Sequence, residues 1–240
     1  MAEALVLLPG MMCDARIFAS QINILSRDRA VMVAPITQGE RVEEIASSLI
    51  DHLPQRLALA GLGLGGVVAM EILRRIPDRV ARLCLMDTHA LAESPAEAAA
   101  REPQIIAARA GRFEEVIGAM LPSDSLAPGA GRLSVRAAFR AMASDLGPEV
   151  FVRQSRALQR RRDQQSTLRK YKGPALILCG AHDAVTPVKR HAVMAELMPA
   201  AQLEVIEEAG HLPPLEAPET VTAALGDWLR RPLAAQRGAA

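Results

Sequence analysis

Short runs of apolar residues alternate along this chain with segments in which apolar positions recur every three or four residues. Runs that are apolar throughout are typical of strands buried on both faces of a parallel sheet. The second pattern is clearest between Val42 and Leu53, where one apolar stripe predicts an amphipathic helix. The apolar runs predict six strands: Ala4–Leu8, Val31–Ala34, Leu57–Ala60, Leu83–Met86, Ala175–Cys179 and Leu203–Ile206.

This alternation predicts an α/β fold with a doubly wound, mostly parallel sheet of about six strands and right-handed crossovers. Near the end of the pattern, Thr186 and Pro187 indicate a helix start. Threonine is a good N-cap residue, and proline is favoured at the first helical position.

The alternation stops between about Thr88 and Lys172, where no strand-like run occurs and prolines divide the chain into helical pieces. The stretch is too long for a loop of a compact domain. We therefore expect residues 88–172 to form a helical cap inserted into a core of residues 1–87 and 173–232. Because the insertion follows a strand directly, the cap is expected to lie over the carboxyl ends of the strands. Residues 233–240 are expected to form a flexible tail.

Composition narrows the classes of partner and compartment. The 240 residues carry a net charge of +1, which favours neither nucleic acid nor an anionic membrane as a partner. Cys13, Cys84 and Cys179 are odd in number and lack metal-type spacing, so we expect free thiols, no metal site and a reducing compartment. The first apolar run, Ala4–Leu8, is too short for a signal peptide, and no run approaches the length of a membrane span. A cytoplasmic protein is expected, and the oligomeric state cannot be read from the sequence.

A basic cluster lies near the end of the inserted region. We interpret it as the solvated face of a helix; the alternative is a site that pairs with a carboxylate or phosphate of a substrate. Its members are Arg153, Arg156, Arg160, Arg161 and Arg162.

A glycine-rich turn between a predicted strand and a predicted helix can be interpreted in two ways. Gly61, Gly63 and Gly66 spell the dinucleotide-binding fingerprint G-x-G-x-x-G, and Asp87 lies 21 residues further on, where a ribose-binding acid is expected. The same turn also matches the hydrolase pattern G-x-S-x-G, with Gly63 in the place of the serine. The fingerprint normally opens its fold, whereas two predicted strands precede this turn. We therefore favour the second interpretation and keep an NAD(P)-binding oxidoreductase as an alternative.

Further motifs follow the other predicted strands, at the edge where open α/β sheets bind ligands. In chain order they are Pro9-Gly10, the glycine turn, Gly180 with Asp183 and Pro187, and Gly210-His211. This ordered set resembles the α/β-hydrolase superfamily, particularly its small bacterial esterase-like members with a helical cap, and the resemblance extends from Leu5 to Trp228.

The resemblance implies a role for each matched residue. His211 would be the base and Asp183 the acid of a Ser-His-Asp triad, with Asp87 as an alternative acid. The backbone N–H groups of Met11 and Leu64 would bind the oxyanion. The implied activity is hydrolysis of carboxylic esters or related acyl bonds of small molecules, with no cofactor.

Gly63 departs from the family pattern, because glycine has no side chain that could attack a carbonyl carbon. Two hypotheses remain open. In the first, the chain is a hydrolase that is inactivated or impaired because it has lost its nucleophile. In the second, glycine is native, and the chain is a non-hydrolytic binder or an enzyme that uses His211 and Asp183 as a general base. In either case, we expect close strand–helix packing to require small residues at Gly61 and Gly65, whereas Gly63 would relieve a strained backbone. Few aromatic residues are present, which favours an aliphatic, methionine-containing pocket.

Overall fold

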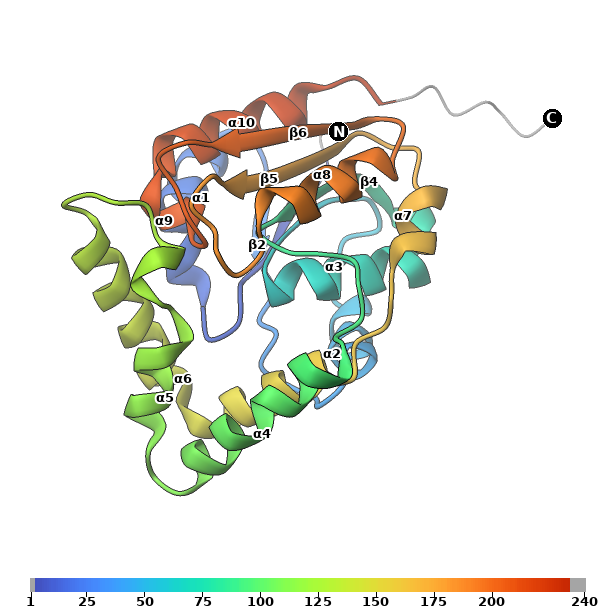
Figure 1. The fold of residues 1–240 in the computed structure, drawn as a ribbon. Helices are drawn as coiled ribbons and strands as arrows, with labels where there is room; N and C mark the ends of the chain where they lie inside the picture. Colours follow the sequence, from blue (N-terminus) through green and yellow to red (C-terminus); the bar gives the residue numbers. More distant parts are fainter. Residues whose placement is uncertain (1–2, 234–240) are drawn as a thin grey trace.

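The computed structural model describes residues 3–233, and its centre is a six-stranded sheet in which every paired strand is parallel (Figure 1). The strand order is β2-β1-β3-β4-β5-β6, so the chain winds outward in both directions from β1 and β3. The predicted doubly wound parallel sheet is therefore confirmed. The strands are β1 (Ala4–Leu8), β2 (Val31–Val33), β3 (Leu57–Leu62), β4 (Val80–Met86), β5 (Ala175–Gly180) and β6 (Ala201–Ile206).

Helices cover both faces of the sheet. Successive residues of β1, such as Leu5 and Val6, belong to different apolar clusters, because neighbouring side chains of a strand point to opposite faces of the sheet. Helices α1 (Ala19–Leu25) and α10 (Pro218–Arg230) contribute to the cluster on one face. The cluster on the other face is built from α2 (Val42–Ile50), α3 (Leu64–Arg75) and α8 (Val188–Glu196).

The region between β4 and β5 is helical. Helices α4 (Pro95–Arg109), α5 (Phe113–Met120) and α6 (Arg132–Gln159) pack against one another beside the sheet (Figure 1). We refer to α4–α6 as the cap helices. Gly147 interrupts α6 with a φ of +79°, immediately before Pro148, which cannot continue the helical hydrogen bonding. Helix α7 (Gln165–Lys170) instead packs against α3.

Short elements complete the chain. They include α9 (Pro213–Glu216) and the 3₁₀ turns η1 (Ala15–Phe18), η2 (Pro77–Arg79) and η3 (Ser123–Ser125). None of the helices in the described part of the chain combines the length and apolar character that a bilayer crossing requires. The predicted tail at 234–240 lies outside the described residues.

The prediction for the start of α8 was wrong in detail. The helix begins at Val188, Pro187 occupies the N-cap position, and no side chain caps the helix. Thr186 is not the cap because its N–H and hydroxyl both donate hydrogen bonds to the carboxylate of Asp183. The residue expected to cap a helix thus serves the predicted site instead.

Candidate functional site

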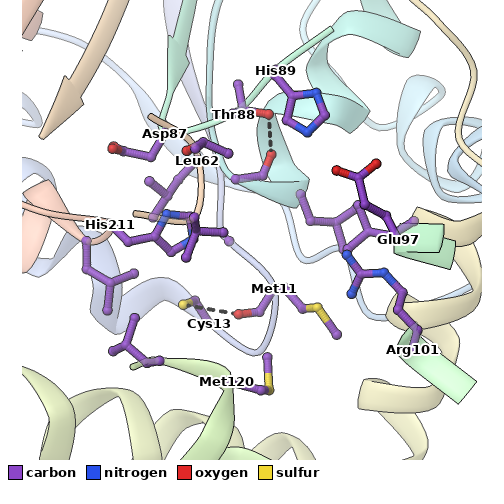
Figure 2. Close-up of a pocket in the computed structure, with 18 of the residues that line it drawn as sticks. Met11, Cys13, Leu62, Asp87, Thr88, His89, Glu97, Arg101, Met120 and His211 are labelled. Carbon is purple, nitrogen blue, oxygen red and sulfur yellow. Dashed lines mark hydrogen bonds between the residues drawn. The ribbon is translucent and has the colours of Figure 1, made fainter. Parts of the chain in front are cut away.

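A cavity of about 430 Å³ lies at the carboxyl ends of the strands, where the sequence places its candidate residues. Gly63, Asp87 and His211 line it from loops that follow three different strands, and Met11 and Leu64 complete this wall. Figure 2 shows His211 and Asp87 on one side of the cavity, with Glu97 and Arg101 of α4 across from them. The predicted site residues are therefore brought together beside the cap helices.

His211 and Asp183 form a hydrogen-bonded pair. The Nδ1 atom of His211 lies 2.9 Å from Oδ2 of Asp183, whose side chain is fully buried. The backbone N–H groups of Val185 and Thr186 donate to Oδ1 of Asp183 at 2.8 and 3.0 Å. Burial alone would raise the pKa of Asp183, but the hydrogen bonds from His211 and Thr186 and the charge of His211 lower it to about 2. The carboxylate is therefore ionised and orients the imidazole with Nδ1 as the donor.

The loop that carries His211 is fastened at several points. The backbone N–H of His211 donates a hydrogen bond of 2.7 Å to the carbonyl of Ser125, which lies in the segment between α5 and α6. One carboxylate, that of Glu216 on α9, accepts three further backbone hydrogen bonds at 2.8–3.0 Å. The donors are the N–H groups of Gly210, Leu212 and Ala127. The histidine loop is thus tied both to the core and to the segment joining two cap helices.

Asp87 lies next to this pair but does not bond to the imidazole. One oxygen accepts the Gly180 N–H at 3.1 Å, and the other, although buried, has no hydrogen-bond partner among the described residues. Burial, together with the negative charge of Asp183, raises the pKa of Asp87 well above its ordinary value. Two adjacent buried carboxylates cannot both be ionised at low cost, and their opposite pKa shifts favour the proton on Asp87 and the charge on Asp183. This favours Asp183 over Asp87 as the partner of His211.

The glycine turn separates positions that need glycine for space from one that does not. A Cβ on Gly61 would lie 2.4 Å from the carbonyl oxygen of Gly65, and one on Gly65 would lie 2.2 Å from that of Leu8. A Cβ on Gly66 would lie 2.6 Å from Thr88. These three glycines therefore allow close packing, which accounts for two of the three fingerprint glycines, Gly61 and Gly66, without a nucleotide.

Position 63 is different. A Cβ there would meet nothing closer than 3.8 Å, and the residue lines the cavity. Its backbone has φ of +50° and ψ of −116°, a conformation that residues with a side chain rarely adopt. The Gly63 N–H donates to the Met86 carbonyl at 2.9 Å, and the Thr88 hydroxyl donates to the Gly63 carbonyl at 2.8 Å (Figure 2). The end of β4 therefore holds the turn in this conformation.

Two backbone N–H groups beside the turn remain available. Among the described residues, the N–H of Met11 has no hydrogen-bond acceptor. Leu64 is the first residue of α3, so its N–H has no acceptor within the helix. Both residues line the cavity next to Gly63. A developing negative charge on an oxygen could be stabilised there.

Cys13 also lines the cavity but is unsuited to act as a nucleophile. Burial, together with the charge of Asp14, raises the pKa of the Cys13 thiol to about 12. The thiol contacts the Met11 carbonyl oxygen at 3.5 Å. A protonated thiol of this kind is a small apolar side chain rather than a reactive one.

The basic cluster is not a uniform solvated face. Arg161 is buried, with 9% exposure, and lines the cavity, so the interpretation as a surface helix face was wrong for this residue. The other four arginines bond outside the cavity lining, to the carbonyl of Thr37 or to the carboxylates of Glu40, Glu43 and Glu102. A run of adjacent arginines carries no signal that would identify the inward-facing member.

Other parts of the lining also differ from expectation. Met11 and Met120 line the cavity, as a methionine-containing pocket predicts, but so do Phe139 and Phe151 of α6. His89 is part of the lining as well.

One three-residue group within residues 3–233 could offer metal ligands, with ligand atoms within 4.8 Å of one another: Asp87, Asp183 and His211. It coincides with the hydrogen-bonded pair and its neighbour.

Comparisons with known proteins agree with this architecture. A profile described as "Alpha/beta hydrolase family" matches residues 5–225. A pimeloyl-[acyl-carrier protein] methyl ester esterase of Chromobacterium violaceum is 26% identical over 198 residues, 78% of this chain and 75% of that protein. The putative carbamate hydrolase RutD of Pseudomonas savastanoi is 25% identical over 95% of this chain and 94% of its own length.

Among solved structures, a thermophilic esterase from Thermogutta terrifontis, with malate bound, is 29% identical and has a TM-score of 0.86, covering 96% of this chain and 90% of that one. The enol-lactonase from Burkholderia xenovorans LB400 shares the fold, with a TM-score of 0.84 at 22% identity over 96% of this chain and 91% of its own. With the profile spanning nearly all of the described sheet and the relatives similar over most of their lengths, the chain belongs to the α/β-hydrolase family.

Proposed function

We propose that this chain is a carboxylic ester hydrolase of the Ser-His-Asp type in which Gly63 replaces the nucleophile, so that it binds esters but hydrolyses them slowly or not at all. The observation that carries the proposal is the 2.9 Å His211–Asp183 pair beside a turn with space for a side chain at position 63. The esterase relatives support the same class of substrate.

The geometry suits a defined sequence of steps once a serine stands at position 63. The hydroxyl attacks the ester carbonyl, and His211 takes its proton while Asp183 holds the imidazole. The N–H groups of Met11 and Leu64 stabilise the oxyanion. The imidazole then protonates the leaving alkoxide, and water attacks the acyl-enzyme with the same histidine as base.

The direct test compares Gly63→Ser with the unmodified chain on p-nitrophenyl esters of short and medium acyl length. We expect kcat/KM to rise by at least about a thousandfold, because oxyanion binding alone leaves a small fraction of the full rate. Gly63→Ala is the matched control, since it adds the Cβ without the hydroxyl. No gain in the serine form, with the fold intact by circular dichroism, would contradict the proposal.

The two carboxylates can be separated in the serine background. Asp183→Asn should lower kcat by about 10³–10⁴, because an amide no longer stabilises the imidazolium or fixes its tautomer. Asp87→Asn should lower it far less, because the raised pKa of Asp87 favours its neutral form and Asp87 makes no hydrogen bond to the imidazole. The reverse order would make Asp87 the acid.

A second candidate is a reaction in which His211 and Asp183 activate a water in the space beside Gly63. The open side-chain direction at this position favours it. Measurable turnover by the unmodified chain that His211→Ala abolishes would identify this chemistry. Turnover that persists in His211→Ala would exclude it.

A further inference from the structure

A group of charged side chains lines the cavity between the cap helices and the core, apart from the His211–Asp183 pair. It contains Arg101 of α4, Arg161 at the end of α6 and Arg190 of α8, together with Glu93 and Glu97. Figure 2 shows Arg101 and Glu97 across the cavity from His211. Three guanidinium groups thus face two carboxylates in one part of the lining.

The carboxylates are already engaged. Glu93, whose side chain is 2% exposed, accepts three hydrogen bonds from Arg101 in a close ion pair of 2.6 Å. Glu97 accepts from the Ser94 N–H at 2.8 Å and from Arg190 at 3.3 Å. Arg161 approaches Glu93 only to 4.0 Å, beyond hydrogen-bond distance. With three guanidinium groups and two carboxylates, the group carries a net charge of +1, and Arg161 is its most weakly paired member.

The hydrogen-bond donors of the group also outnumber its acceptors. Arg161 and Arg190 both direct an N–H at Nε2 of His89, at 2.7 and 2.8 Å. A guanidinium cannot accept, so Nε2 must offer its single lone pair, and the ring proton must lie on Nδ1. One lone pair cannot satisfy two donors fully. His89 is consequently neutral, and burial with the two nearby guanidinium charges lowers its pKa to about 3.

Two further donors are buried and unpaired. Neither Nε of Arg161 nor Nδ1 of His89 has a hydrogen-bond partner among the described residues, and both side chains line the cavity. The residues are 9% and 7% exposed. Burial lowers the pKa of Arg161 to about 10, which leaves it charged at neutral pH. A buried charge whose nearest carboxylate is 4.0 Å away and makes no hydrogen bond to it is costly, and a bound anion would offset that cost.

We propose that Arg161, assisted by His89 and Arg190, binds a carboxylate of the substrate, so that the cavity takes esters of molecules that carry a second, ionised carboxyl group. A single unneutralised charge matches a carboxylate better than a doubly charged phosphate. Charge-assisted hydrogen bonds to the anion would use the unpaired donors. This inference rests on the proposed function for the ester end of the ligand, but carboxylate binding can be tested without turnover.

The test is isothermal titration of the unmodified chain, which lacks the serine, with monomethyl esters of straight-chain dicarboxylic acids. The comparison ligands are the same esters with a carboxamide in place of the carboxylate, which have nearly the same shape and no charge. We expect the acids to bind about ten- to a hundredfold more tightly at one or more chain lengths. Equal affinity of acid and amide at every chain length would overturn the proposal, and this result does not depend on whether any variant folds.

The residue is tested with Arg161→Met, which should remove the preference for the acid, and with Arg160→Met as the matched control. Arg160 is the preceding residue, does not line the cavity and lies 3.6 Å from Glu40. Loss of the preference in both variants would point to unspecific charge attraction and overturn the assignment to Arg161. Retention of the preference in Arg161→Met would do the same.

Turnover separates this proposal from the preceding one. In Gly63→Ser, the half-ester should be hydrolysed with a higher kcat/KM than the ester-amide, and Arg161→Met should equalise them. A preference in binding without hydrolysis in Gly63→Ser would leave the carboxylate site standing and remove the hydrolase. Hydrolysis of both esters with equal kcat/KM would support the hydrolase and remove the carboxylate site.

Discussion

The backbone at position 63 and the space around it make different demands on the residue. The φ of +50° disfavours any side chain, whereas the open direction toward the cavity accepts one. At Gly61 and Gly65 the demands are the opposite: neither residue has a positive φ, but a side chain on either would lie too close to a backbone oxygen. Glycine at 63 therefore stabilises the turn, while glycine at 61 and 65 makes it possible.

Gly63→Ser and Gly63→Ala should both lower the free energy of unfolding, by about 1–3 kcal/mol, because each puts a Cβ into a strained conformation. The corresponding fall in Tm is roughly 2–4 °C for each kcal/mol in a chain of this size. Urea denaturation and calorimetry measure both quantities. An equal or higher Tm in both variants would contradict the strained turn.

Asp87 should make the protein less stable as pH rises. Its folded-state pKa lies above the ordinary value of 3.8, so from about pH 4 upward the unfolded state releases a proton that the native state retains. The free energy of unfolding then falls with pH, by at most about 1.4 kcal/mol per unit for this group. Asp87→Asn should flatten the decline between pH 4.5 and 7.5 in urea titrations. Parallel curves for the two proteins would mean that Asp87 is not protonated.

Sequence reasoning reached the residues whose chemistry follows a strand end and missed those defined by tertiary contacts. Asp183 and His211 could be found because the carboxyl ends of parallel strands share one edge. Arg161 could not be distinguished from its neighbours, since only the packing of α6 decides which arginine faces inward. The link that Glu216 makes to the α5–α6 segment could not be found either, because its partner Ala127 lies 89 residues away in the chain.

At the scale of elements, strands with an unbroken apolar run were the most predictable. β1 has its predicted bounds, whereas β4, although central, begins at Val80 rather than Leu83 because Arg82 interrupts its apolar run. All six residues of β3 are buried, and its apolar run was visible in the sequence. The start of β6 was missed because the strand lies at the sheet edge, where Gln202 and Leu203 are exposed and no apolar run is needed. The start of α8 was misplaced because Thr186 bonds to Asp183.

Glu216 and the histidine loop form a unit that can be tested separately from the triad. In the Gly63→Ser background, Glu216→Gln replaces one accepting oxygen with an NH₂ group that cannot accept. We expect kcat to fall by about tenfold or more with a smaller change in KM, because the imidazole is less well positioned. The variant should also lose about 1.5 kcal/mol or more of stability. Glu219→Gln, an exposed carboxylate on α10, is the matched control and should change neither quantity.

At the scale of the whole molecule, the cap helices and the core share one apolar cluster. Ile105, Phe113 and Phe139 of the cap belong to the same cluster as Leu5 of β1 and Trp228 of α10. A cap held in this way is not an independent unit, because much of its apolar surface is buried against the core.

The cap and core should therefore unfold together. Trp228, the single tryptophan, is 1% exposed and reports on the core, whereas far-ultraviolet circular dichroism includes the cap helices. We expect the two probes to give coincident urea transitions. A dichroism change that precedes the fluorescence change would show that the cap melts first.

The hydrogen bond from His211 to Ser125, with Glu216 bridging to Ala127, has a consequence for inhibition. Moving the segment that joins α5 and α6 would break these hydrogen bonds and loosen the loop that positions the imidazole. A small molecule that displaces this segment should therefore inhibit the serine form by misplacing its general base, without contacting the imidazole.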